Sequence, residues 1–144
     1  MVNFKTQVTI IGGGPSGLLL SQLLMNEGID TIILEKHTKS HVLSRIRAGV
    51  LESGTVEILK HAGVGKRIDI DGFVHEGTYL SSENKGFRVS FSETVGKSVT
   101  IFGQTEVTKD LYQKQEEREA NIFFQVKNVN IIDPKCSKTE VIFE

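Results

Sequence analysis

Residues 7–17 read QVTIIGGGPSG, and this stretch indicates the fold of the N-terminal part of the chain. It opens on a short, β-branched and mostly apolar run, the pattern of a strand buried on both faces. Leucines then recur at helical spacing over residues 16–26, and Gly28 stands where a left-handed helix end is needed. Residues 31–35 (TIILE) form a second apolar run. The order strand, glycine turn, helix, strand predicts a right-handed βαβ unit over residues 7–35.

Helical and strand patterns continue to the end of the chain. Residues 52–61 have helical character, and alternating polarity predicts antiparallel strands over about 73–102. A polar helix is expected over about 105–120 and a β-hairpin over about 122–144. No repeat or flexible linker is present, so nothing indicates a second domain. We predict the α/β class: a Rossmann-like, three-layer fold that binds FAD or NAD(P), incomplete and with an antiparallel β segment.

Composition excludes several classes of protein. The 144 residues include 17 basic and 18 acidic side chains, and the formal charge of −1 removes any general electrostatic reason to bind nucleic acid. The apolar runs are too short for a membrane span or a secretion signal. A single cysteine, Cys136, excludes an internal disulfide framework, and its polar surroundings predict an exposed thiol without a role. We expect a cytoplasmic protein.

The glycines of the opening stretch have the spacing of a dinucleotide fingerprint, and they lie between a strand and a helix as that motif requires. Gly12 would allow a tight turn, Gly14 would let the backbone approach a pyrophosphate, and Gly17 would permit close packing of helix on strand. The phosphates would meet free N–H groups at the helix N-terminus, where the Ser16 hydroxyl can donate a further hydrogen bond. The alternative is a tight turn without a ligand.

Glu35 ends the second predicted strand, where an acceptor for ribose hydroxyls belongs. Its carboxylate favours a free 2′-hydroxyl, as in FAD or NAD, and would repel a 2′-phosphate in the same position. A solvated acid at a strand end is the alternative.

Positive charge gathers in residues 36–51, which contain no carboxylate and carry a local charge of +4. The cations are Lys36, Lys39, Arg45 and Arg47. An anion is a suitable partner for this segment, although the arginines could also be solvated loop cations. His37 and His41 have a spacing that suits a metal on one helix face, but the lysines crowd the same turn. We therefore predict no metal site.

Four stretches together resemble one family of flavoproteins, in order and over nearly the whole chain. They are residues 7–20 (QVTIIGGGPSGLLL), 45–52 (RIRAGVLE), 71–77 (DGFVHEG) and 103–108 (GQTEVT). The first is shared by many FAD enzymes, whereas the other three together are similar to the 4-hydroxybenzoate 3-monooxygenase (p-hydroxybenzoate hydroxylase) family. The resemblance covers the N-terminal part of the family's chains only.

The resemblance implies a cofactor-binding role for each motif. It places the FAD pyrophosphate at Gly12, Gly14, Ser16 and Gly17, and the adenosine ribose at Glu35. The segment whose backbone passes along the cofactor toward the flavin corresponds to Arg45, Ile46, Arg47, Ala48, Gly49 and Val50. Gln104 corresponds to a glutamine that hydrogen-bonds the cofactor near its ribityl chain.

Two further roles follow from the resemblance alone. Lys36, His37 and His41 fall in the segment that contacts the NADPH ribose phosphate, where the better-known pattern has Arg, Gln and Tyr, so NADPH and NADH both stay open as reductants. His75 corresponds to the solvent end of a proton relay that deprotonates the substrate phenol, a catalytic role. A half-buried structural histidine is the alternative.

Members of this family use FAD, NADPH and O₂ to hydroxylate 4-hydroxybenzoate to 3,4-dihydroxybenzoate. The resemblance implies this activity, in aromatic compound degradation, for a complete enzyme with a small aromatic acid as substrate. It implies no nucleic-acid or membrane partner and leaves a homodimer open. We expect the 144-residue chain alone to be inactive. The alternatives are a stand-alone or truncated dinucleotide-binding module without catalysis and another FAD-dependent oxidoreductase.

Overall fold

The computed structural model describes residues 3–135 and 138–144. Cys136, for which the sequence predicts an exposed thiol, lies outside the described residues. The chain divides into two compact units: unit 1 comprises Met1–Arg45 and Thr108–Glu144, and unit 2 comprises Ile46–Val107. Among the described residues, no helix is long and apolar enough to cross a membrane.

Unit 1 contains a parallel sheet of order β1-β2-β8, formed by Val8–Ile11, Thr31–Glu35 and Asn121–Phe124. Helix α1 (Pro15–Asn26) connects β1 to β2 and is followed by Gly28 at φ +72°. The predicted βαβ unit is therefore confirmed. Ile33 of β2 pairs with Ile10 on one side and Ile122 on the other, which makes β2 the central strand.

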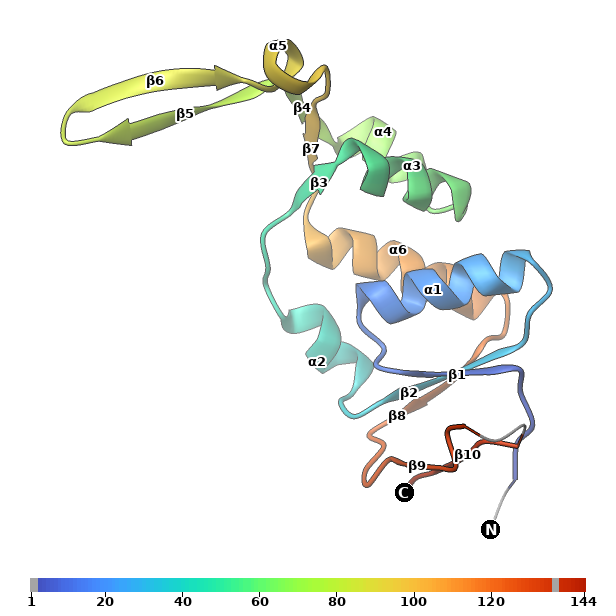
Figure 1. Cartoon of the computed structure of the whole chain (residues 1–144). Coiled ribbons are helices and arrows are strands. Elements are labelled where there is room, and N and C mark those ends of the chain that lie inside the picture. The colour runs from blue at the N-terminus through green and yellow to red at the C-terminus, as the bar shows by residue number, and fades with distance from the viewer. Residues whose placement is uncertain (1–2, 136–137) are drawn as a thin grey trace. The chain divides into compact units, whose positions relative to one another are not determined.

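Both faces of this sheet are covered. Helices α1 and α6 (Gln104–Glu117) cover one face, and the hairpin of β9 (Asn130–Ile132) and β10 (Glu140–Ile142) covers the other (Figure 1). All of β2 is buried, as the apolar sequence of that strand predicts. Toward the hairpin, Ile32 and Leu34 join Val126 in an apolar cluster, and each such side chain stabilises the fold by about 1.5–3 kcal/mol.

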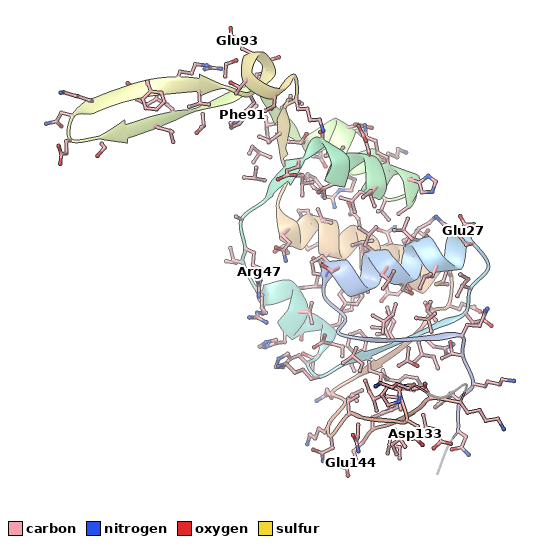
Figure 2. The ribbon with its side chains drawn as sticks, in the orientation of Figure 1. Glu27, Arg47, Phe91, Glu93, Asp133 and Glu144 are labelled. Carbon is pink, nitrogen blue, oxygen red and sulfur yellow. The ribbon has the colours of Figure 1, made fainter. Side chains whose placement is uncertain are left out.

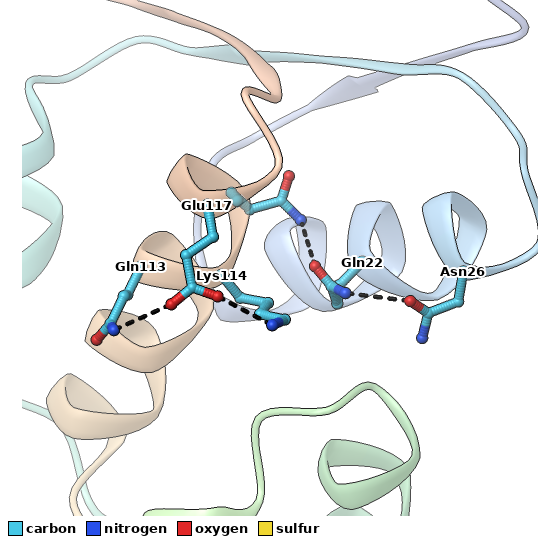
Figure 3. A network of polar contacts seen from close by, with 6 residues as sticks. Gln22, Asn26, Gln113, Lys114 and Glu117 are labelled. Atoms are coloured by element: carbon cyan, nitrogen blue, oxygen red, sulfur yellow. Dashed lines mark hydrogen bonds and ion pairs between the residues drawn. The ribbon is translucent and has the colours of Figure 1, made fainter.

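A buried polar network accompanies the apolar contacts between α1 and α6. The Ser21 hydroxyl lies 2.6 Å from that of Thr31 and donates to Gln115 Oε1 at 3.2 Å. The Gln115 amide donates to the carbonyl of Leu18 and to Gln22 Oε1, and Figure 3 shows Gln22 of α1 facing α6. Ser21, Gln22 and Gln115 are fully buried, so these hydrogen bonds offset the cost of removing polar groups from water.

Unit 2 is built on antiparallel pairing. Its three-stranded sheet has the order β3-β7-β4, from Val50–Glu52, Val99–Ile101 and Phe73–His75. A separate hairpin pairs β5 (Gly77–Ser82) with β6 (Lys85–Ser90), and Glu83 and Asn84 at its tip both have positive φ angles, as a type I′ hairpin turn requires. The unit also holds α3 (Ser53–His61), α4 (Lys66–Asp71) and α5 (Phe91–Val95).

The structure alters three of the expected elements. The hairpin expected over about 122–144 is confined to β9 and β10, because the preceding apolar run pairs with β2 as a third parallel strand. The antiparallel region over 73–102 is interrupted by α5, whose first turn is capped when the Ser90 hydroxyl accepts a hydrogen bond from the Glu93 N–H. The helix expected over 105–120 ends at Glu117, and Glu119 has φ +54°.

Candidate functional site

The fingerprint glycines carry the geometry for which each was singled out. Gly12 has φ +119°, a conformation that side chains rarely allow. A Cβ on Gly17 would overlap the carbonyl oxygen of Gly12, so α1 packs against the loop closely enough to exclude any side chain. A Cβ on Gly14 would meet nothing within 4 Å. Glycine is therefore favoured at Gly12 by the backbone conformation and at Gly17 by close packing, whereas the loop is open at Gly14.

The N-terminus of α1 is open to an anion. Gly14 is the N-cap residue, no side chain caps the helix, Pro15 occupies the first turn, and that turn contains no acidic residue. Ser16 is exposed on the same turn. Free N–H groups and the helix dipole both favour negative charge here. Together with the open space at Gly14, this arrangement fits the pyrophosphate of a dinucleotide.

Glu35 lies at the end of β2 and is only 7% exposed, so it is not the solvated acid considered as an alternative. Its Oε2 accepts a hydrogen bond from the Gly13 N–H at 2.7 Å, and its Oε1 accepts one from the His37 N–H at 2.8 Å. A carboxylate has about four lone-pair positions, so two stay available for ribose hydroxyls. The side chain is thus held in place beside the fingerprint loop.

Tyr112 of α6 is part of the same arrangement, and the sequence pattern of the polar helix expected over about 105–120 does not identify its role. Its hydroxyl donates to the Gly13 carbonyl at 2.7 Å, and its side chain is 1% exposed. Burial, and then the charge of Glu35, raise the pKa of the Tyr112 phenol, which keeps it a hydrogen-bond donor. The only available signal is general: a buried tyrosine hydroxyl needs a partner.

The segment after Glu35 brings together the side chains proposed for the reductant. Thr38 caps the N-terminus of helix α2 (Lys39–Ser44), since its hydroxyl accepts a hydrogen bond from the His41 N–H. The rings of His37 and His41 are stacked, with centroids 4.0 Å apart. Partial burial and the neighbouring charges of His41 and Lys36 lower the pKa of His37.

Lys39 forms an ion pair within the protein, and this pair reduces the positive charge that the segment offers to a ligand. Its ammonium group pairs with Glu116 of α6 at 2.5 Å and lies 5.3 Å from the centre of the Tyr112 ring. Among the described residues, no group of three or more His, Cys, Asp or Glu side chains is placed to hold a metal ion.

The segment expected along the cofactor begins at the end of unit 1 and continues into unit 2. Arg45 is the C-cap residue of α2 and has extended φ and ψ angles. The next three residues, Ile46, Arg47 and Ala48, are exposed and lie outside helices and strands. Arg47 projects from the connection between α2 and β3 (Figure 2). This exposure leaves the segment accessible to a ligand.

Gly49 fixes the end of this segment within unit 2. A Cβ on Gly49 would lie 2.5 Å from Gly103 Cα, and the Gly49 carbonyl accepts a hydrogen bond from the Phe102 N–H at 2.8 Å. Val50 then begins β3, and Gln104 begins α6 directly after Gly103. Backbone contact thus brings two of the predicted cofactor segments together.

His75 is the last residue of β4, pairs with Val99 of β7 and is exposed. It is therefore not the half-buried structural histidine considered as the alternative. The structure brings the fingerprint, Glu35 and residues 36–41 together in unit 1, and it places His75, Gly49 and Gln104 in unit 2.

Comparisons with known proteins agree with this geometry. A model of the FAD binding domain family matches residues 5–141. The chain is 46% identical over 134 residues to p-hydroxybenzoate hydroxylase of Acinetobacter baylyi, covering 92% of this chain and 33% of that enzyme. This likeness confirms the resemblance expected from the sequence. Dialkyldecalin synthase of Streptomyces rugosporus is 38% identical over 66 residues, which are 46% of this chain and 14% of that protein.

The fold also occurs in a solved structure of low sequence identity. The crystal structure of p-nitrophenol 4-monooxygenase PnpA from Pseudomonas putida matches 99% of this chain and 37% of its own, with a TM-score of 0.82 at 19% identity. The α/β fold expected from the sequence is confirmed, and the chain spans about a third of the length of both the Acinetobacter baylyi hydroxylase and PnpA.

Proposed function

The chain belongs to the FAD binding domain family and is related to flavin-dependent monooxygenases, and from this premise we propose that it forms the adenosine and pyrophosphate site of an aromatic hydroxylase. The reaction is the hydroxylation of 4-hydroxybenzoate to 3,4-dihydroxybenzoate with O₂ and NADPH or NADH. The uncapped N-terminus of α1 beside the buried carboxylate of Glu35 carries the proposal.

FAD fits the residues of unit 1 in two places. Its pyrophosphate would lie in the open space at Gly14, against the N–H groups of α1 and the Ser16 hydroxyl. The hydroxyls of its adenosine ribose would donate to Glu35, which excludes a 2′-phosphate from that position. Bound FAD supplies the redox and oxygen chemistry, and the protein supplies binding, orientation and shielding.

The remaining residues have roles in the same proposal. Arg47 and its neighbours in residues 45–50 bind along the cofactor, where guanidinium groups suit phosphate oxygens. Gln104 hydrogen-bonds the cofactor near its ribityl chain. Lys36, His37 and His41 meet the reductant, and His75 exchanges a proton between solvent and the relay that deprotonates the substrate phenol.

A second candidate is a protein that keeps the dinucleotide site for a different reaction. The likeness to a dialkyldecalin synthase favours it, since that protein's name describes no hydroxylation. Product analysis of the complete protein separates the two candidates: formation of 3,4-dihydroxybenzoate with NADPH oxidation supports the first, and FAD binding without this product supports the second.

The site itself can be tested without catalysis by Gly14→Val. A Cβ at this position would meet no protein atom within 4 Å, and the φ of −77° suits valine, so the fold should be kept. The side chain would occupy the space of the pyrophosphate and should abolish FAD binding, measured by quenching of flavin fluorescence. Gly54→Ala, at another glycine with open surroundings, is the matched control. Unchanged FAD affinity in Gly14→Val would refute the site.

A further inference from the structure

Tyr112 connects α6 to the centre of the fingerprint loop. Its hydroxyl donates to the Gly13 carbonyl at 2.7 Å, while the Gly13 N–H donates to Glu35. Both polar groups of Gly13 are therefore held by buried side chains from different elements. The Tyr112 ring is itself fixed between Phe124, with ring centroids 5.9 Å apart, and the ammonium group of Lys39.

Because a peptide group is planar, the hydrogen bond to the Gly13 carbonyl also fixes the direction of the Gly14 N–H. In a trans peptide the C=O and the N–H point in opposite directions. Because the Gly13 carbonyl points at the Tyr112 hydroxyl, the N–H of Gly14 points away from Tyr112. A Cβ at Gly14 would meet no protein atom within 4 Å, so the loop is open at this glycine.

We propose that Tyr112 is a positioning residue that holds the Gly13–Gly14 peptide so that the Gly14 N–H faces the pyrophosphate of the bound dinucleotide. The inference rests on the proposed FAD site. Without the hydroxyl, this peptide can rotate and its N–H is no longer preorganised to donate to the phosphate. Preorganisation of a donor lowers the cost of binding without any direct contact between Tyr112 and the ligand.

Tyr112→Phe tests the inference because it removes the hydroxyl and keeps the buried ring. The chain has one other tyrosine, Tyr79, which is 67% exposed in unit 2, so Tyr79→Phe is a control with the same chemical change. Affinities for FAD, ADP and adenosine should be measured on the flavin-free protein. We expect Tyr112→Phe to raise the Kd for FAD and ADP about three- to tenfold, the effect of one hydrogen bond.

The Kd for adenosine distinguishes a role of Tyr112 in positioning the loop from a general loosening of the fold. Adenosine keeps the ribose that meets Glu35 but has no phosphate, so its Kd should not change in Tyr112→Phe. An equal loss of affinity for adenosine and ADP would overturn the inference, as would wild-type affinity for ADP. If the unaltered protein binds no FAD, the proposed function fails as well, whereas normal FAD binding by Tyr112→Phe contradicts this inference alone.

A second measurement needs no variant. The hydroxyl proton of Tyr112 should be detectable by NMR as a slowly exchanging signal in the unaltered protein. ADP binding should slow its exchange further, because the ligand fixes the peptide to which the hydroxyl donates. Exchange that is fast, or unaffected by ADP, would overturn the role of Tyr112.

Discussion

The carboxylate of Glu35 accepts a hydrogen bond from the backbone N–H of Gly13 at 2.7 Å, which ties the end of β2 to the fingerprint loop 22 residues earlier. Its other oxygen accepts a hydrogen bond from the N–H of His37. One buried side chain thus orients the loop proposed for the pyrophosphate and the start of the segment proposed for the reductant. The end of β2 and the glycine loop are therefore held together by this side chain.

We predict that Glu35→Ala weakens FAD binding about 10- to 100-fold, since a charged hydrogen bond contributes about 1.5–3 kcal/mol. The variant should also be less stable, because two backbone N–H groups lose their acceptor. Glu35→Gln keeps one neutral acceptor, so its FAD affinity and its stability should lie between those of the unaltered protein and those of Glu35→Ala. Flavin fluorescence titration and thermal unfolding measure the two effects.

Glu117→Ala is the control for Glu35. Glu117 accepts hydrogen bonds from Lys114 and Gln113, as Figure 3 shows, but it is exposed on α6. Surface pairs of this kind contribute little, so neither FAD affinity nor stability should change noticeably. An equal FAD affinity in Glu35→Ala and Glu117→Ala would contradict the ribose role of Glu35.

The nucleotide-binding βαβ unit could be predicted because its pattern is local. Gly12 and Gly28 have positive φ angles that favour glycine, and Gly17 leaves no room for a Cβ; glycines at this spacing are visible in the sequence itself. The role of Tyr112 could not be predicted in this way. It depends on a hydrogen bond from α6 to a loop 99 residues earlier, and in the sequence a buried tyrosine looks like any other core residue.

The same reasoning explains the elements that the sequence pattern misses. The apolar run of β8 can be a hairpin strand or a parallel strand, and only its pairing with β2 distinguishes the two. Lys39 contributes to the predicted anion-binding charge, yet its partner Glu116 lies far along the chain. Charge counted within a segment omits such distant pairs.

Gly17→Ala tests the packing of α1 on the loop. The new Cβ would overlap the Gly12 carbonyl and come within 3.2 Å of Ile10 Cγ2, so the helix must shift. We expect a loss of stability of about 1–3 kcal/mol, measured by denaturant unfolding. In contrast, Gly54→Ala meets open space in α3 and should be neutral or stabilising. Equal stabilities of the two variants would refute the close packing.

His75→Ala tests the proposed proton relay. Because His75 is exposed at the end of β4, the variant should keep its fold and its FAD affinity. Substrate deprotonation should become slower and the pH dependence of hydroxylation should shift in the complete enzyme. His61→Ala, at an exposed histidine that ends α3, should leave the pH profile unchanged. Loss of flavin in His75→Ala would instead assign His75 a structural role.

The last prediction concerns the reductant and the charge state of His37. Partial burial, His41 and Lys36 lower the pKa of His37 below its usual value of 6.5, so it is neutral at pH 7 and takes up a proton only in more acidic solution. The unfolded chain binds that proton more readily, so in the absence of nucleotide the contribution of His37 to stability falls as the pH drops through 6.5. A 2′-phosphate would reverse this preference by favouring the charged imidazole.

Preference for NADPH over NADH should therefore be modest and nearly constant from pH 7 to 8, and it should rise as the pH falls toward 6. Lys36 provides a point charge without the bidentate geometry of arginine, so Lys36→Arg should strengthen the preference throughout. The measurement is the ratio of kcat/KM for the two reductants in the complete enzyme, with His37→Gln as the variant that should remove the rise. A ratio that is independent of pH in the unaltered enzyme, or a preference for NADH at every pH, would show that this segment does not bind the phosphate.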